Sequence, residues 1–250
     1  MSLRLKHLFA RAAAGLVAGA LMLLAVPSAP AEERSAAPRV EGYAEITPPE
    51  CGPVPDSYFS DAVFLGDSMA SNLEMLNLFP EAEFVWKVGM SVNSTRYRQF
   101  KVKGESKKDT AIEAVARYSP KKLYILLGSN SLDVVTSQAV IKDYHAMLDS
   151  IIEMMPHTVI YVLSPPPMTA RAFSKVSGPN PKRYANFEEG LRQIAQERGL
   201  YYIDLYHMVA DEKGYLRRDM AAGDGYHLSQ ETSQALADYI KTHAVPYGNP

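Results

Sequence analysis

The chain has 250 residues, a formal charge of −2 and a single cysteine, Cys51. No basic stripe with interleaved aromatic residues occurs, which argues against a nucleic-acid partner. One cysteine excludes an intrachain disulfide, so packing must stabilise the fold, and the length beyond an N-terminal leader suits one α/β domain.

The first 31 residues have the pattern of an export signal. Basic residues precede an uncharged apolar stretch over residues 12–26, and Ala29-Pro30-Ala31 fits a small-residue cleavage site. The apolar stretch is shorter than the roughly 20 residues that a membrane span requires. We therefore expect a cleaved signal peptide over residues 1–31, with an uncleaved N-terminal anchor as the alternative. The loss of Arg4, Lys6 and Arg11 would take the formal charge from −2 to −5.

Either alternative places the rest of the chain in the periplasm, on the cell surface or outside the cell, with membrane contact only through an uncleaved N-terminus. Residues 32–56 are rich in Pro, Glu and Ala and contain few large apolar side chains. This composition predicts a linker or a strap on the domain surface. From residue 57 onward apolar runs alternate with helical patterns, which predicts one domain over residues 57–246.

Five short apolar runs predict β-strands, and the longer segments between them predict helices. The predicted strands cover residues 63–65, 83–88, 123–127, 159–163 and 201–205. The predicted helices cover residues 70–78, 109–118, 139–155, 187–198 and 231–242. The charged run over residues 101–108 predicts a solvated loop. The proline-rich stretch over residues 164–181 predicts a long irregular loop, a feature that is often functional.

Strands that are apolar on both faces and separated by helices are typical of a parallel sheet covered on both sides. The sequence therefore predicts an α/β fold, a three-layer α/β/α sandwich with a central five-stranded parallel sheet. Such sheets bind ligands at the carboxyl ends of their strands. Functional side chains are thus expected directly after the strands.

Four polar clusters occupy or approach these positions. Gly66-Asp67-Ser68 follows the first strand, Gly89 follows the second, and Gly128-Ser129-Asn130 follows the third. A fourth cluster, from Asp224 to His227, precedes the last helix and could reach the same edge through a loop. The first three clusters are predicted to meet at one edge of the sheet.

Together these clusters contain the groups that acyl transfer requires. A serine hydroxyl is a weak nucleophile that needs a base, and His227 can take the proton of Ser68. Asp224 can hold the imidazole in the required tautomer through a tight turn. An oxyanion needs fixed donors, and the sequence offers the Ser68 N–H, the Gly89 N–H and the Asn130 amide. Glycine is expected at position 89 because a side chain there would crowd the substrate.

The four clusters resemble, in this chain order, the motifs of the SGNH (GDSL) hydrolase superfamily, and the resemblance covers residues 57–245. The matching motifs are Gly-Asp-Ser at 66–68, Gly89, Gly-Ser-Asn at 128–130 and Asp-x-x-His at 224–227. The resemblance implies a flavodoxin-like α/β/α sandwich, hydrolysis of acyl esters and no metal or other cofactor. In this comparison Asp67 hydrogen-bonds the loop and is not itself the catalytic acid.

The third motif departs from the family pattern, which usually reads Gly-x-Asn-Asp. Ser131 stands in the position of that aspartate, and Asp133 is the candidate to brace the Asn130 loop instead. The first motif also ends in Met69 where the family name has leucine. These departures concern the level of activity and leave the predicted fold unchanged.

Each candidate residue also has a simpler interpretation. Ser68 is a preferred helix N-cap residue, Asn130 favours turns, and Asp224-Gly225 is a turn signal. The structural rival, the α/β-hydrolase fold, requires Gly-x-Ser-x-Gly, and Ala70 occupies the last position of that motif. Three further histidines, His145, His157 and His207, are interpreted as surface or packing groups. No pair among them has ligand spacing with a third donor, so no metal site is expected.

The sequence thus predicts an exported serine esterase that hydrolyses O-acyl esters, with short acyl groups on carbohydrate favoured because no wide apolar loop is apparent. Its partner would be a small-molecule or carbohydrate ester, and the oligomeric state is not predicted. Two alternatives remain: an O-acetyltransferase acting on an exported polysaccharide, and a catalytically weak glycan-binding module. The side chains expected to shape the pocket are Arg96, Tyr97, Arg98, Met168, Arg171, Phe173 and Tyr184.

Overall fold

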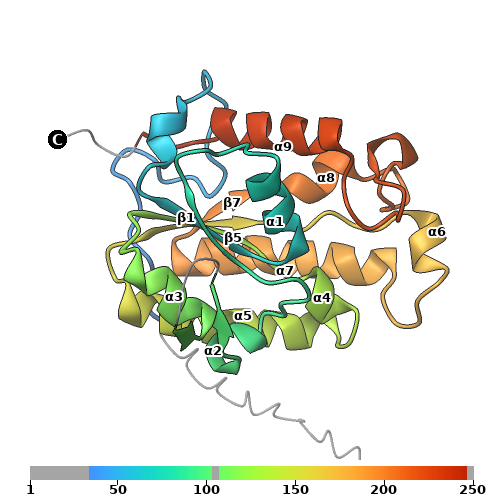
Figure 1. Cartoon of the computed structure of the whole chain (residues 1–250), viewed down its shortest axis with the longest axis horizontal. Coiled ribbons are helices and arrows are strands. Elements are labelled where there is room, and N and C mark those ends of the chain that lie inside the picture. Colours follow the sequence, from blue (N-terminus) through green and yellow to red (C-terminus); the bar gives the residue numbers. More distant parts are fainter. Residues whose placement is uncertain (1–33, 103–106, 247–250) are drawn as a thin grey trace, which may run out of the picture. The chain divides into compact units, whose positions relative to one another are not determined.

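The computed structural model describes residues 34–102 and 107–246, so the predicted signal peptide lies outside the described residues. A five-stranded sheet forms the centre of this part of the chain, with all neighbouring strands parallel. The strands are β1 (Ala62–Gly66), β2 (Glu83–Trp86), β5 (Lys122–Leu126), β6 (Val159–Leu163) and β7 (Tyr201–Ile203), in the spatial order β2-β1-β5-β6-β7 (Figure 1). The predicted five-stranded parallel sheet is confirmed.

The order of the strands contains one reversal. The chain passes from β1 outward to β2 and then returns to place β5 on the other side of β1. Open parallel sheets bind ligands at the carboxyl ends of the strands beside such a reversal. Ser68 follows β1 and Asn130 follows β5, so the topology brings these two residues to that position.

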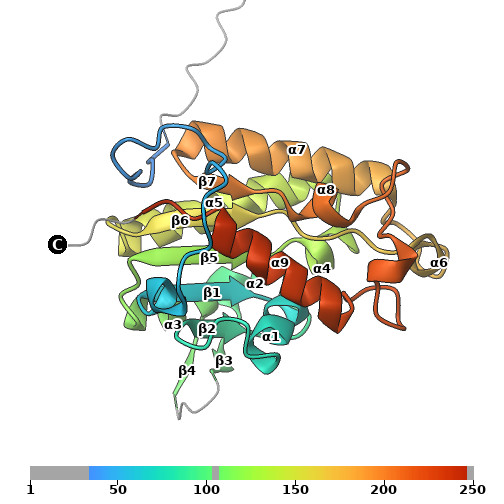
Figure 2. The same ribbon diagram turned by 90° about the horizontal axis from the view of Figure 1, so that it is seen from above.

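Helices cover both faces of the sheet and complete the predicted three-layer α/β/α arrangement (Figures 1 and 2). One face is covered by α3 (Ala111–Arg117), α5 (Ser137–Met154) and α7 (Pro181–Arg198). The other is covered by α1 (Ser68–Met75), α8 (Leu205–Val209) and α9 (Gln230–Thr242). Within the described ranges, none of the helices has the length and hydropathy needed to cross a membrane.

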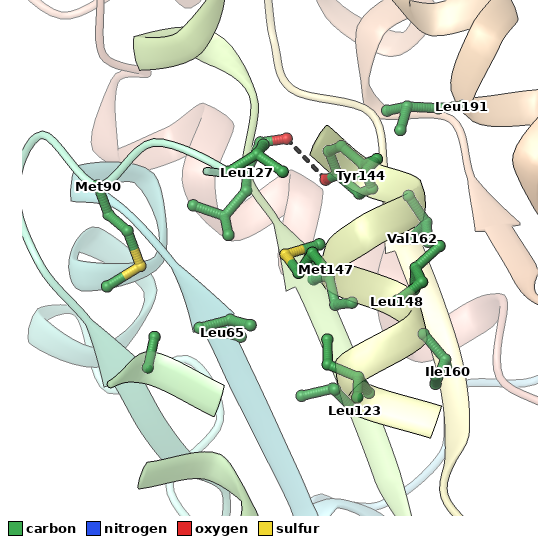
Figure 3. Close-up of a cluster of buried hydrophobic side chains, with 14 of the residues drawn as sticks. Leu65, Met90, Leu123, Leu127, Tyr144, Met147, Leu148, Ile160, Val162 and Leu191 are labelled. Atoms are coloured by element: carbon green, nitrogen blue, oxygen red, sulfur yellow. Dashed lines mark hydrogen bonds between the residues drawn. The ribbon is translucent and has the colours of Figure 1, made fainter. Parts of the chain in front are cut away.

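Alternate residues of each strand supply the two halves of the core. On one face Leu65, Leu123 and Ile160 pack against Met147 and Leu148 of α5, as Figure 3 shows. The same figure shows how a polar group is accommodated there: the buried Tyr144 hydroxyl donates to the Leu127 carbonyl at 2.8 Å. Pairing this hydroxyl avoids the cost of a buried donor without a partner.

On the opposite face one aromatic ring from each strand joins a continuous ladder across the sheet. Phe84, Phe64, Tyr124, Tyr161 and Tyr201 lie in register on adjacent strands. Their neighbouring ring centroids are 4.4–5.2 Å apart in stacked geometry. Such pairs add to the burial of the rings and fix strand register, which in turn fixes where the strand ends lie.

The segments predicted as loops contain short elements. The irregular stretch over residues 164–181 includes α6 (Ala170–Phe173), and α7 begins at Pro181, earlier than predicted, because Asn180 caps it and proline suits the first helical turn. The ends of the charged segment 101–108 pair in the hairpin of β3 (Phe100–Lys101) and β4 (Lys108–Asp109). The remaining short elements are α2 (Ser94–Tyr97), α4 (Ser129–Leu132) and two 3-10 helices, Asp56–Phe59 and Arg218–Met220.

Residues 34–56 lie against the domain as a strap. The Tyr202 N–H of edge strand β7 donates to the Ile46 carbonyl at 2.7 Å, and the Ala37 N–H donates to the Arg198 carbonyl. The Cys51 N–H is similarly bonded to the Thr242 carbonyl at the end of α9. The strap therefore pairs a backbone group of β7 that would otherwise be exposed at the sheet edge.

Candidate active site

The passage from β1 into α1 places the Ser68 side chain at the carboxyl end of the sheet. A side chain at Gly66 would lie 2.5 Å from the Ala70 Cβ and 2.9 Å from the Leu126 carbonyl, so only glycine permits this close approach. Asp67 is the N-cap of α1 and accepts the Met69 N–H at 3.0 Å. The interpretation of Ser68 as a simple N-cap is therefore wrong, because Asp67 occupies that position.

Ser68, His227 and Asp224 form a continuous hydrogen-bonded chain. The His227 Nε2 lies 2.9 Å from the Ser68 Oγ, and the His227 Nδ1 lies 2.7 Å from the Asp224 Oδ2. The fourth predicted cluster therefore reaches the carboxyl edge of the sheet, 159 residues after Ser68. The His227 and Asp224 side chains are 34% and 51% exposed, so the chain of contacts is open to solvent.

The turn from Asp224 to His227 holds its carboxylate by several bonds. The Asp224 Oδ1 accepts the N–H groups of Tyr226 and His227, at 2.8 and 3.0 Å. Partial burial acts to raise the pKa of Asp224, but hydrogen bonds from the His227 ring and from both N–H groups lower it to about 2. This carboxylate is consequently ionised at neutral pH, as an acceptor for the imidazole must be.

The same turn is anchored to the long loop that follows β6. Gly225 has a φ of +78°, and a Cβ there would lie 2.4 Å from the Thr169 Oγ1. The Thr169 N–H donates to the Gly225 carbonyl at 3.0 Å. Glycine is required by both the left-handed backbone and the close approach of Thr169, and the loop after β6 thereby fixes the position of the turn.

Asp67 connects the start of α1 to the loop that carries Asn130. Its side chain is buried, 1% exposed, and its Oδ2 accepts the Asn130 side-chain amide at 2.7 Å. Burial raises the pKa of Asp67 to about 6, although the bonds from Met69 and Asn130 partly oppose the shift. The expectation that Asp67 hydrogen-bonds the loop is confirmed. An amide nitrogen carries two hydrogens, so Asn130 retains one for another acceptor.

The Asn130 loop is braced by residues other than the one expected. The buried Ser131 Oγ accepts the Val92 N–H at 3.0 Å, which ties this loop to the segment that follows Gly89. Arg183 of α7 donates to the Leu132 carbonyl at 2.8 Å. Asp133 is exposed, and its side chain forms no hydrogen bond or ion pair within the described residues, so its expected bracing role is wrong.

Gly89 lies in a turn closed by the Met90 N–H and the Lys87 carbonyl, at 3.0 Å. Its φ is +75°, which favours glycine, whereas a Cβ would meet no atom of the described chain within 4 Å. The turn conformation therefore accounts for glycine without reference to a substrate. Within residues 34–102 and 107–246, the N–H groups of Gly89 and Ser68 have no hydrogen-bond partner, and no hydrogen bond joins Gly89 directly to Ser68 or Asn130.

The side chains expected to shape a pocket divide into two groups. Met168, Phe173 and Tyr184 are buried in the core, and their expected part in shaping the pocket stays a prediction. Arg171 is exposed and lines a cavity beside the Asp224 turn. Tyr97 is also exposed, and the Arg96 guanidinium lies 4.6 Å from its ring centroid.

One histidine lies near two carboxylates, a combination that the expectation about pairs of histidines did not cover. Glu188, Asp204 and His207 offer ligand atoms that lie within 4.8 Å of one another. Glu188 comes from α7, so the spacing within the sequence could not reveal it. The Arg192 guanidinium lies 3.3 Å from Glu188 and 3.7 Å from Asp204. This single positive group lies beside both carboxylates and offsets part of their charge.

Comparison with known proteins gives one family and a set of similar folds. Residues 50–235 match the model of the GDSL-like lipase/acylhydrolase family. No curated protein matches the chain. A GDSL-like lipase from Bacteroides thetaiotaomicron shares 12% sequence identity at a TM-score of 0.57, over 76% of this chain and 89% of that one.

Two further solved structures have the same fold, with similarly low sequence identity to this chain. A lipase/acylhydrolase from Enterococcus faecalis shares 14% identity at a TM-score of 0.52, over 72% of this chain and 93% of that one. A carbohydrate esterase of family 3 from Talaromyces cellulolyticus gives 14% identity and a TM-score of 0.52, over 72% and 94% of the two chains. At these identities the structures show a shared fold.

Proposed function

Because the chain belongs to the GDSL-like lipase/acylhydrolase family and is thus a carboxylic ester hydrolase, we propose that it is an exported serine esterase for short O-acyl groups on carbohydrate. The observation that carries this proposal is the hydrogen-bonded chain from Ser68 through His227 to Asp224. These three residues have the arrangement that converts a serine hydroxyl into a nucleophile.

In the first half of the proposed reaction, the Ser68 Oγ attacks the ester carbonyl carbon while the His227 Nε2 takes the hydroxyl proton. The ionised Asp224 stabilises the imidazolium that results. The tetrahedral intermediate then collapses, the bond to the alcohol oxygen breaks, and His227 returns the proton to that oxygen. In the second half, water attacks the acyl-Ser68 with His227 as base, which releases the acid and restores the hydroxyl.

Three donors are proposed to stabilise the oxyanion. The N–H groups of Ser68 and Gly89 have no partner in the described chain, and the Asn130 amide has a second hydrogen available. Ser68 is the first residue of α1, where helix N–H groups lack intrahelical acceptors. Loss of one such donor in a serine hydrolase costs on the order of 100- to 1000-fold in kcat.

The proposed substrate class and location have separate support. The half-exposed His227 and Asp224 suit an ester carried by a bulky carbohydrate, and one protein of similar fold is a carbohydrate esterase. The charge and hydropathy pattern of residues 1–31 supports export. An assembled set of nucleophile, base and acid supports catalysis over a purely glycan-binding role.

The test is turnover of 4-nitrophenyl acetate by the full chain and by the variant Ser68→Ala. We expect a loss of at least about 10⁴-fold in kcat, because the variant cannot form the acyl-enzyme. Ser60→Ala removes an exposed hydroxyl remote from the site and is the matched control. Unchanged activity in S68A would contradict the proposal. Counting free acetate against acetylated sugar, with glycan added as acceptor, separates hydrolysis from acetyl transfer.

A further inference from the structure

A cavity of about 500 Å³ lies beside the turn that carries Asp224. It is lined by residues 221–225, by residues of α6 and by Arg218 of the 3-10 helix Arg218–Met220. Thr169 and Gly225 both line it, and the hydrogen bond between their backbones fixes the loop after β6 against the turn. The cavity therefore shares residues with the candidate active site.

Two positive side chains line this cavity without a negative partner. Arg171 and Arg218 are exposed, and neither guanidinium forms a hydrogen bond or an ion pair within the described part of the chain. The two carboxylates of the cavity are already engaged. Asp211 accepts the N–H groups of Lys213 and Tyr215, and Asp224 is bonded to His227.

The backbone holds both arginines at defined places. Arg171 lies two residues after Thr169, which is bonded to Gly225 and caps α6. Arg218 begins the 3-10 helix whose last residue, Met220, accepts the Ser229 N–H at the start of α9. The positions of the two arginine backbones relative to the Asp224 turn are therefore set by hydrogen bonds.

The chemistry of the proposed esterase decides which part of a substrate reaches this cavity. The acyl oxygen must face the donors at Ser68, Gly89 and Asn130. The alcohol oxygen must face the imidazole of His227, because it receives its proton from that ring. The cavity is lined by Asp224 and Gly225 of the turn that carries His227, and Asp224 is bonded to the Nδ1 side of the ring. An alcohol part that is long enough to pass from the Nε2 side over this turn, such as a sugar, therefore extends toward the two arginines.

We propose that Arg171 and Arg218 form a subsite for an anionic group on the alcohol part of the substrate, and that the enzyme favours O-acylated acidic sugars. This inference rests on the proposed esterase function. Guanidinium groups bind carboxylates and phosphates through paired N–H donors, so the anionic group is either a sugar carboxylate or a sugar phosphate.

The test compares two esters that differ in one charge, 4-acetoxybenzoate and its neutral methyl ester. We expect the ratio of their kcat/KM values, anionic over neutral, to fall about threefold in R171Q and in R218Q, and about tenfold in the double variant, as expected for exposed ion pairs. The ratio in the unchanged enzyme falls as salt is raised from 0.05 to 0.5 M, because ions screen exposed charges. Conservative R171K and R218K retain most of the ratio.

Lys175→Gln is the matched control, because it removes a positive charge from the same loop outside the cavity. We expect it to leave the ratio unchanged. A double arginine variant with the ratio of the unchanged enzyme would overturn the subsite. That failure is distinct from failure of the esterase proposal, which would appear as full activity of S68A toward both esters.

Acetylated methyl glucuronoside and acetylated glucose 6-phosphate then distinguish a carboxylate from a phosphate as the anionic group. Loss of preference for both substrates in the double variant supports the subsite.

Discussion

Two segments of the molecule carry the same pattern, Asp-x-Tyr-His, at residues 204–207 and 224–227. The hydrogen bonds between their aspartate and histidine are nearly identical. In both, the aspartate Oδ1 accepts the histidine N–H at 3.0 Å. The Oδ2 lies 2.8 Å from the Nδ1 of His207 and 2.7 Å from that of His227.

The two segments differ in what the fold places beyond the ring. The His227 Nε2 lies against the Ser68 hydroxyl, whereas the Asp204–His207 pair caps α8 and neighbours Arg192 and Glu188. The bond within an Asp-x-x-His pair therefore does not by itself mark a catalytic site. The pair at 224–227 has the form of a catalytic triad because the fold places the Ser68 hydroxyl, from the end of β1, next to its ring.

The largest expected effect on kcat comes from replacing the two histidines by alanine, one at a time. His227→Ala removes the base next to Ser68, and we expect kcat for 4-nitrophenyl acetate to fall about 10³- to 10⁵-fold. His207→Ala removes a ring with the same local bonds and should change kcat less than twofold. Steady-state kinetics of both variants measure the difference. Similar losses in the two variants would show that the comparison is wrong.

Loss of the two aspartates, Asp224 and Asp204, should likewise have unequal effects on kcat. Asp224→Ala leaves the His227 imidazole without its acceptor, and we expect kcat to fall roughly 10²- to 10⁴-fold. Asp204→Ala should leave kcat near that of the unchanged enzyme, since its partner, the His207 ring, faces no nucleophile. The same kinetic assay, with circular dichroism to verify folding, decides the outcome. A greater loss in D204A than in D224A would reverse the assignment.

A third prediction concerns the buried carboxyl of Asp67. Its pKa is raised to about 6 from an ordinary value of 3.8, so the folded state holds a proton that the unfolded state has lost between these pH values. The free energy of unfolding should therefore fall by about 2 kcal/mol as pH rises from 4 to 6 and level off above about pH 7, relative to Asp67→Asn. Urea denaturation of both proteins across this range measures it. A pH-independent difference between them would contradict the shift.

The smallest effect is expected for the stability of D204A. Asp204 is the N-cap of α8, and loss of such a cap costs about 1 kcal/mol. Asp224 caps no helix and forms its bonds within a turn on the surface. Urea denaturation at pH 7 should therefore show D204A to be less stable than the unchanged protein. An unchanged midpoint for D204A would indicate that its capping bond contributes nothing.

The elements that the sequence predicts well are those with a strong local signal. Buried strands such as Val159–Leu163 show five consecutive apolar residues, and both this strand and the parallel arrangement are confirmed. Residues 224–227 signal their own turn. The helix α7 begins at Pro181, earlier than predicted, because its first turns have little apolar periodicity and its start is marked by the Asn180 cap instead.

Contacts between distant segments could not be predicted in the same way. The bond from the Val92 N–H to Ser131 joins two loops, and nothing in either segment alone indicates it. Arg218 reaches the cavity beside Asp224 through the return of the chain after β7, which has no periodic signal. Glu188 likewise lies near Asp204 only because α7 packs against the end of β7.

The most direct test of the account is the site of covalent modification by a fluorophosphonate, which reacts with an activated serine hydroxyl. Mass spectrometry of the digested full chain should place one adduct on Ser68, with slow modification in H227A and none in S68A. The exposed Ser60 and Ser174 should remain unmodified, since no histidine in the described part of the chain is bonded to either. An adduct on another serine, or no adduct on the folded protein, would contradict Ser68 as the nucleophile.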